Sequence, residues 1–84
     1  MDSRVALIGI VVENSESVAE LNALLHNYAD YIIGRMGVPY KKRGVSVISI
    51  AIDAPSDTIS TLSGKIGMLP GVTSKTVYAK LDNE

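Results

Sequence analysis

Apolar residues form a nearly continuous run near the start of the chain, from Val5 to Val12, interrupted only by Gly9. The run is rich in β-branched residues and ends at a polar cluster, Glu13-Asn14-Ser15-Glu16. A short apolar run bounded by polar residues is typical of a strand that is buried on both faces. We therefore expect a first strand over residues 5–12.

A helical pattern begins at Ser17. Ser17 and Glu20 have the spacing of a capping box, in which two side chains satisfy backbone N–H groups at a helix start. Apolar residues then recur at three- and four-residue spacing, which is typical of the buried stripe of a helix. They are Val18, Leu21, Leu25, Tyr28 and Ile32. The pattern predicts a helix over about residues 17–31.

Two strands and a turn are predicted next. Gly34 and Gly37 disfavour further helix, and residues 32–39 predict a short strand whose Pro39 suits a sheet edge. Residues 40–44 predict a turn. Residues 45–52 alternate strictly, which predicts a third strand with two different faces. Large residues occupy one face (Ile48, Ile50, Ile52) and smaller ones the other (Val45, Val47, Ser49, Ala51).

A second helix and a last strand complete the pattern. Residues 53–57 open the helix, with Pro55 near its start and acidic residues near the positive end of its dipole. The expected buried stripe is Ile59, Leu62, Ile66 and Leu69. Pro70-Gly71 ends this helix, and residues 72–81 predict the last strand.

The predicted order is βαββαβ. Right-handed crossovers then give an α+β, ferredoxin-like domain spanning residues 1–84, with a four-stranded antiparallel sheet and two helices on one face. The first and third strands lie in its centre.

One face of this sheet has no cover within the chain. A contiguous exposed apolar patch usually marks an interface, so we expect a dimer or tetramer that associates through Val45, Val47, Ser49 and Ala51. The alternative is that this face is exposed to solvent and carries only scattered apolar residues, which is normal for a protein surface.

Composition narrows the class of protein. The chain has 84 residues, no cysteine, one histidine and a net charge of −1. Disulfides and cysteine-ligated iron–sulfur clusters are excluded, and a single histidine argues against a metal site within one chain. The charge gives no support for independent nucleic-acid binding. The first apolar run is too short to span a bilayer and lacks a cleavage pattern, so we expect a cytoplasmic protein without membrane contact.

Several segments together resemble the iron-only hydrogenase system regulator family, whose members are small domains similar to ACT domains and to the C-terminal domain of nickel-responsive repressors. The segments are Arg4 to Glu13, Leu25-His26-Asn27, Ile33-Gly34-Arg35-Met36-Gly37, Leu62-Ser63-Gly64-Lys65-Ile66-Gly67, Gly71-Val72 and Lys75-Thr76-Val77. The resemblance implies a ferredoxin-like fold, oligomerisation and a regulatory role connected with iron-only hydrogenase. It carries over no catalytic residue.

Two departures from the related folds bear on ligands. Amino-acid-binding ACT domains have a glycine-containing turn after the first strand, whereas residues 13–16 contain no glycine. Nickel-responsive repressors use several histidines and a cysteine, whereas this chain has His26 alone. We therefore expect neither amino-acid binding at that turn nor direct nickel sensing, and we expect no cofactor.

The candidate contacts for an effector or partner are His26, Arg35, Met36 and Tyr40. His26 lies beside the buried stripe, near Asp30 at i+4, and is either a boundary residue or a ligand or switch. Residues 40–43 combine an aromatic ring with three positive charges, which is either a solvated turn or an anion contact. Ser63-Gly64-Lys65 resembles a phosphate loop but falls within the second helix, where glycine favours packing or helix termination.

These observations favour a regulatory or adaptor oligomer that binds a small effector or a protein partner. Two alternatives stay open: a structural subunit of a larger complex, and a small enzyme with an active site between subunits around His26 or Arg35. Residues 1–84 contain no set of side chains that predicts a catalytic site, so the enzyme is the least favoured.

Overall fold

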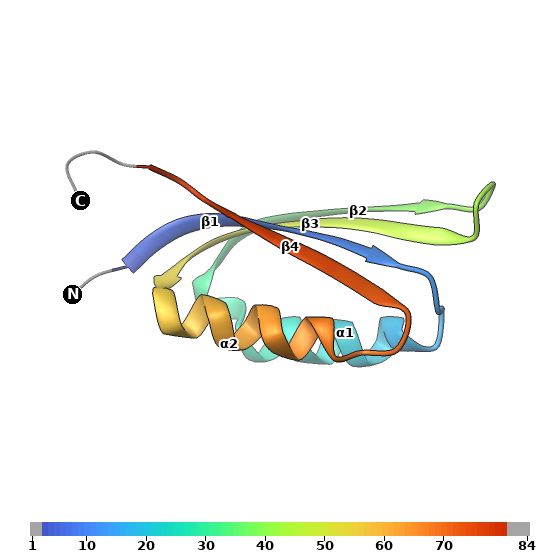
Figure 1. Ribbon diagram of the computed structural model, residues 1–84, viewed down its shortest axis with the longest axis horizontal. Helices are drawn as coiled ribbons and strands as arrows, with labels where there is room; N and C mark the ends of the chain where they lie inside the picture. The colour runs from blue at the N-terminus through green and yellow to red at the C-terminus, as the bar shows by residue number, and fades with distance from the viewer. Residues whose placement is uncertain (1–2, 81–84) are drawn as a thin grey trace.

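A computed structural model describes residues 3–80 of the chain. Four strands form one antiparallel sheet in the order β2-β3-β1-β4, and two helices cover one of its faces (Figure 1). The elements are β1 (Ser3–Val12), α1 (Ser17–Asn27), the short 3-10 helix η1 (Ala29–Tyr31), β2 (Ile32–Tyr40), β3 (Val45–Pro55), α2 (Ser56–Gly67) and β4 (Val72–Tyr78). The predicted α+β ferredoxin-like fold is confirmed, with β1 and β3 in the centre.

The strand register sorts side chains between two faces. β1 pairs with β3 along its whole length, from Ser3 opposite Pro55 to Val12 opposite Ser46. Even-numbered residues of both strands therefore point toward the helices, because successive side chains alternate in a strand. The predicted isoleucine face of β3 is confirmed as buried. The core consists mainly of Ala6, Ile8, Ile10, Val12, Ile48, Ile50, Ile52, Leu21, Leu25, Ile59, Leu62 and Ile66.

The predicted capping box at the start of α1 is wrong. Ser17 is the first helical residue and only 2% exposed, and its hydroxyl donates to the carbonyl oxygen of Pro70 at 2.6 Å. The Oδ1 atom of Asn14 instead accepts the backbone N–H of Glu16 at 3.0 Å, as an Asx turn does. The hydroxyl of Ser17 therefore binds the α2–β4 loop and does not cap its own helix.

Helix α1 ends at Asn27, four residues before the predicted end. Tyr28 leaves the helical region with φ −110° and ψ 16°, and η1 follows. The chain must turn here because Ile32 enters the sheet opposite Ile52. Tyr28 and Ile32 still pack on the core, so the apolar stripe was correct although the helix is shorter.

Strand β3 is longer than predicted and helix α2 starts later. β1 supplies pairing partners as far as Ser3, so β3 continues to Pro55 and Asp53 lies in the sheet. Asp57 is in the first turn of α2, as expected. Leu69 follows the end of α2 but still packs against the core. β4 ends at Tyr78, so its predicted extension over Ala79 and Lys80 is wrong, and Leu81 lies outside the described residues.

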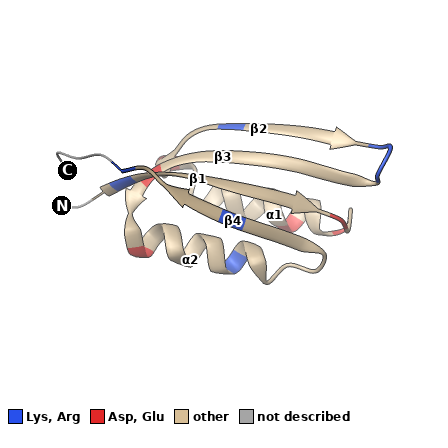
Figure 2. Ribbon diagram, turned by 45° about the horizontal axis from the view of Figure 1, so that its top comes forward, with Lys and Arg blue, Asp and Glu red and all other residues tan. Residues whose placement is uncertain are grey.

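The β2–β3 hairpin extends beyond the ends of both helices and gives the molecule its elongated shape, 43 × 21 × 17 Å (Figure 1). β2 is an edge strand, as predicted, and an irregularity between Ile32 and Gly34 shifts its register with β3. Figure 2 shows the basic residues of the turn gathered at the hairpin tip. Within residues 3–80, no helix is long and apolar enough to cross a membrane.

Candidate functional site

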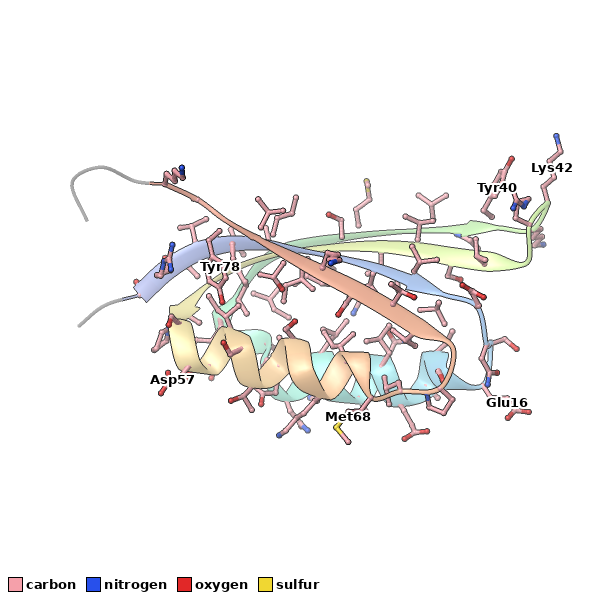
Figure 3. All side chains as sticks on the ribbon, in the orientation of Figure 1. Glu16, Tyr40, Lys42, Asp57, Met68 and Tyr78 are labelled. Atoms are coloured by element: carbon pink, nitrogen blue, oxygen red, sulfur yellow. The ribbon has the colours of Figure 1, made fainter. Side chains whose placement is uncertain are left out.

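The sheet face opposite the helices, which we call the outer face, carries large apolar side chains from all four strands. Their exposed fractions run from 43% for Val47 to 65% for Val77. Figure 3 shows side chains rising from the sheet on the side away from both helices. The large exposed members are Leu7, Met36, Val38, Tyr40, Val47 and Val77.

The register places these apolar residues side by side. Leu7 lies opposite Val77, Val38 lies opposite Val47, and Tyr40 lies opposite Val45. By the same alternation, the charged residues at described strand positions of the outer face are Asp53 and Lys75. Lys75 is on the edge strand β4 and Asp53 is near the end of β3, so the centre of the face is uncharged.

A hollow of about 330 Å³ lies on the outer face where small residues of β2 and β3 meet. Gly34, Ser49 and Ala51 leave room there, and Leu7 and Met36 line it as well. The predicted interface residues Val45, Val47, Ser49 and Ala51 all lie on this face. Their role in association stays a prediction.

His26 and Arg35 come together on the other side of the sheet edge. Arg35 pairs with the inward-facing Ile50, and its guanidinium reaches α1, where Nη2 donates to Oδ1 of Asn22 at 3.0 Å. Both residues line a pocket of about 280 Å³ together with Asn22, Leu25, Ala29 and Ile32. We call this the edge pocket.

The four predicted contact residues therefore do not form one site. Met36 and Tyr40 lie on the outer face, whereas His26 and Arg35 line the edge pocket. Arg35 also lines the hollow on the outer face, so it borders both regions. Sequence reasoning missed Asn22, although its place four residues before His26 on one helix was an available signal. Asp30 follows the end of α1, so its helical spacing with His26 is lost.

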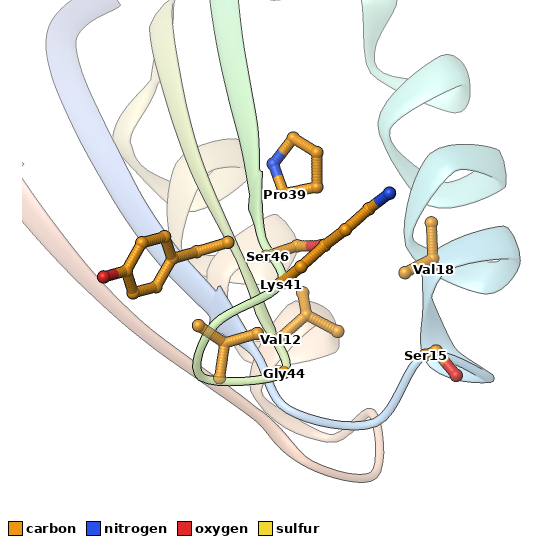
Figure 4. Close-up of a pocket in the computed structure, with 9 residues that line it drawn as sticks. Val12, Ser15, Val18, Pro39, Lys41, Gly44 and Ser46 are labelled. Atoms are coloured by element: carbon orange, nitrogen blue, oxygen red, sulfur yellow. The ribbon is translucent and has the colours of Figure 1, made fainter.

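A second small pocket lies between the hairpin end and the start of α1 (Figure 4). Its volume is about 190 Å³. Val12, Val18 and Pro39 give it mostly apolar walls, and Tyr40 and Lys41 line it from the hairpin. Of the three basic residues of the predicted turn, Lys41 lines this pocket, while Lys42 and Arg43 do not.

The segment that resembles a phosphate loop lies in α2, as expected. The Ser63 hydroxyl accepts a hydrogen bond from the Thr76 hydroxyl at 3.2 Å. Nζ of Lys65 donates to the Tyr28 hydroxyl at 3.4 Å and lies 5.7 Å from the centre of that ring. Gly67 ends the helix. These side chains tie α2 to β4 and to Tyr28, which directly follows α1. Among the described residues, no group of three His, Cys, Asp or Glu residues is placed to hold a metal ion.

Comparison with known families identifies the chain. Residues 4–76 match the family model described as "TM1266-like: Iron-only hydrogenase system regulator, putative". The chain belongs to this family. The solved structure of the uncharacterized protein TM1266 from Thermotoga maritima is 35% identical, with a TM-score of 0.90 over 94% of this chain and 100% of that chain. The resemblance noted in the sequence is thereby confirmed.

A more distant solved structure shares the fold of this TM1266-like chain. It is an unknown protein from Galdieria sulphuraria, 12% identical, with a TM-score of 0.64 over 95% of this chain and 47% of that chain. A search of curated proteins finds no match. The description of the TM1266-like family names a regulator of an iron-only hydrogenase system.

Proposed function

We propose that this TM1266-like chain is a non-catalytic regulatory domain that associates with copies of itself through the outer face and responds to a small effector. The observation that carries the proposal is the continuous apolar surface on the outer face. The family description supports the regulatory role in a hydrogenase system. We further propose that the protein acts in the cytoplasm and does not bind nucleic acid by itself.

The size of the apolar surface favours a second copy as its partner. The exposed parts of the six large side chains add up to roughly 500 Å², near the largest patch of a typical monomer. Two such faces together cover about 1,000 Å², the size at which specific interfaces begin. A domain of this length also buries a smaller share of its unfolded surface than a larger domain does, so the area that association buries adds to its stability.

The shape and charge of the outer face also suit self-association. A two-fold axis brings the same patch of each copy together, so protruding and hollow regions must match within one surface. Met36 protrudes beside the hollow formed at Gly34, Ser49 and Ala51. The charged residues Lys75 and Asp53 lie toward the margin, where water still reaches them in an interface.

Arg35 supports a link between effector and assembly. It lines the edge pocket on one side and the hollow of the outer face on the other. A molecule that orders Arg35 acts next to the interface, and any ligand that binds the assembled form better shifts the chain toward that form. We propose ligand-stabilised assembly as the regulatory mechanism.

Light-scattering chromatography of the wild type and Val47→Glu tests the proposal. We expect a wild-type dimer or tetramer that Val47→Glu dissociates, because the interface buries the new charge without a partner. Ser60→Glu is the matched control, since it adds the same charge at an exposed position of α2. Circular dichroism shows whether each variant is folded. A wild-type monomer, or equal dissociation by both variants, contradicts association through the outer face.

The alternative function is a structural subunit of a larger complex, for which the same apolar face supplies a partner surface. Co-purification with a different protein at fixed stoichiometry, together with a monomeric isolated chain, favours that alternative. An active site between subunits is disfavoured because the edge pocket contains the donors His26, Arg35 and Asn22 without a carboxylate.

A further inference from the structure

We infer that the edge pocket binds a small organic carboxylate, which the guanidinium of Arg35, the amide of Asn22 and the imidazole of His26 hold by its oxygens. This inference rests on the proposed regulatory function and gives its effector a chemical class. It concerns residues of one chain, so it is testable whatever the state of assembly.

Each of the three polar side chains of the edge pocket can donate a hydrogen bond to a ligand. Arginine has five N–H donors and no acceptor, so the atom of Asn22 that meets it must be the carbonyl oxygen. That contact leaves the Nδ2 amide of Asn22 as a donor. Within residues 3–80, the bond to Asn22 is the one side-chain hydrogen bond of Arg35. The pocket therefore offers positive charge and N–H groups to a ligand that must supply acceptors.

The spacing along α1 places two of these donors on one side of the helix. Asn22 and His26 are four residues apart, which is about one turn, and both are exposed. Arg35 approaches the same side from β2. Three donors from two elements thus border one pocket, and the planar fork of arginine matches a carboxylate with two parallel hydrogen bonds.

The floor of the edge pocket is apolar. Leu25 is buried in the core, and Ile32 packs against it. Ala29 adds a third apolar residue to the lining. The volume of about 280 Å³ is just below the usual range for ligand sites, which fits a molecule of few atoms. A short carbon chain attached to the carboxylate shields these apolar residues from solvent. An inorganic anion leaves the same residues exposed to water.

An NMR titration of the full chain with butyrate tests the inference. We expect saturable chemical-shift changes centred on Asn22, His26 and Arg35, with a dissociation constant in the millimolar range because so small a ligand gains little binding free energy. Arg35→Gln should weaken binding about tenfold, since a hydrogen bond to a charged group is lost. Arg43→Gln is the matched control, because it removes the same charge at the hairpin tip and should leave the affinity unchanged.

Two comparison ligands separate the contributions. Butylamine keeps the carbon chain without the anion, and inorganic phosphate keeps negative charge without the chain. We expect neither to reproduce the butyrate shifts. Three results would each overturn the inference: no saturable shift at the three residues, the same affinity in Arg35→Gln, or phosphate binding as tight as butyrate.

The same titration on Val47→Glu distinguishes this inference from the proposed assembly. If that variant is a monomer and still binds butyrate, the edge pocket is complete in one chain. If butyrate binds but leaves the solution mass unchanged, the carboxylate site stands and the proposed link to assembly fails.

Discussion

The hydroxyl of Ser17 donates a 2.6 Å hydrogen bond to the carbonyl oxygen of Pro70, 53 residues further along the chain. Next to it, the backbone N–H of Glu13 donates to the carbonyl oxygen of Gly71 at 2.7 Å. These two bonds join the β1–α1 loop and the first residue of α1 to the α2–β4 loop. The join fixes where both helices lie against the sheet, because each loop connects one helix to one strand.

Ser17→Ala should lower the free energy of unfolding by about 1 kcal/mol, since the hydrogen bond is lost at a buried position. Ser60→Ala, at an exposed position of α2, is the control. Ser60→Ala removes the same hydroxyl from a helix position without such a bond, where alanine only gains helix propensity. Urea unfolding at equal protein concentration measures it, and equal effects of the two variants contradict the prediction.

Gly71→Ala should be more destabilising than Gly44→Ala. Both glycines have positive φ, 68° and 67°, which costs any other residue about 1–2 kcal/mol. A Cβ at Gly71 would also lie 2.7 Å from Cβ of Asn14, whereas nothing lies within 4 Å at Gly44. We expect a loss of about 3 kcal/mol or more at Gly71, because overpacking adds to the backbone cost. Thermal unfolding of both variants measures the difference. Similar losses of stability at Gly71 and Gly44 would contradict the prediction, because they would mean that the loop around Asn14 moves to make room for the new Cβ.

Gly64→Ala should stabilise the protein by about 1 kcal/mol, because alanine restricts the unfolded chain and favours helix. Gly64 is exposed within α2, and no atom lies within 4 Å of a Cβ added there. Gly67→Ala, at the end of the same helix, should give a smaller gain. Chemical unfolding of both variants measures the difference, and destabilisation by Gly64→Ala would mean that this surface is covered in the folded protein.

Leu62→Ala should cost about 2–5 kcal/mol, because it opens a cavity between α2 and the sheet. Met68→Ala should change stability by about 0.5 kcal/mol or less, since Met68 is 84% exposed. The two positions are only six residues apart in the sequence. A difference between the two losses of stability therefore reports how deeply each side chain is buried. Comparable losses at both sites would indicate that the helix layer is itself covered by a partner.

Much of the fold could be predicted from apolar spacing alone. The alternation in residues 45–52 assigned the isoleucines to the helix side, and the three- and four-residue spacing located the buried stripes of both helices. These patterns are local consequences of strand and helix geometry. The ends of elements were less predictable, because α1 stops where Ile32 must reach β3 and β3 extends as far as β1 provides partners.

The candidate site was harder to predict, because its contacts join distant positions. Ser17 has the local pattern of a helix cap, yet a carbonyl oxygen in another loop takes its hydroxyl. Arg35 and Asn22 are 13 residues apart on different elements, and no short motif contains both. Met36 follows Arg35 directly but points to the other face, since neighbouring residues in a strand alternate.

The backbone N–H of Ala79 donates to the carbonyl oxygen of Val5 at 2.9 Å, so the two ends of the described chain lie together, at the opposite end of the molecule from the β2–β3 turn (Figure 1). A short linker joining these ends, with new termini opened at that turn, gives a circular permutant. Its elements run β3, α2, β4, β1, α1, β2, which is again βαββαβ. Each half of the domain therefore supplies one central strand, one helix and one edge strand, and either half can come first.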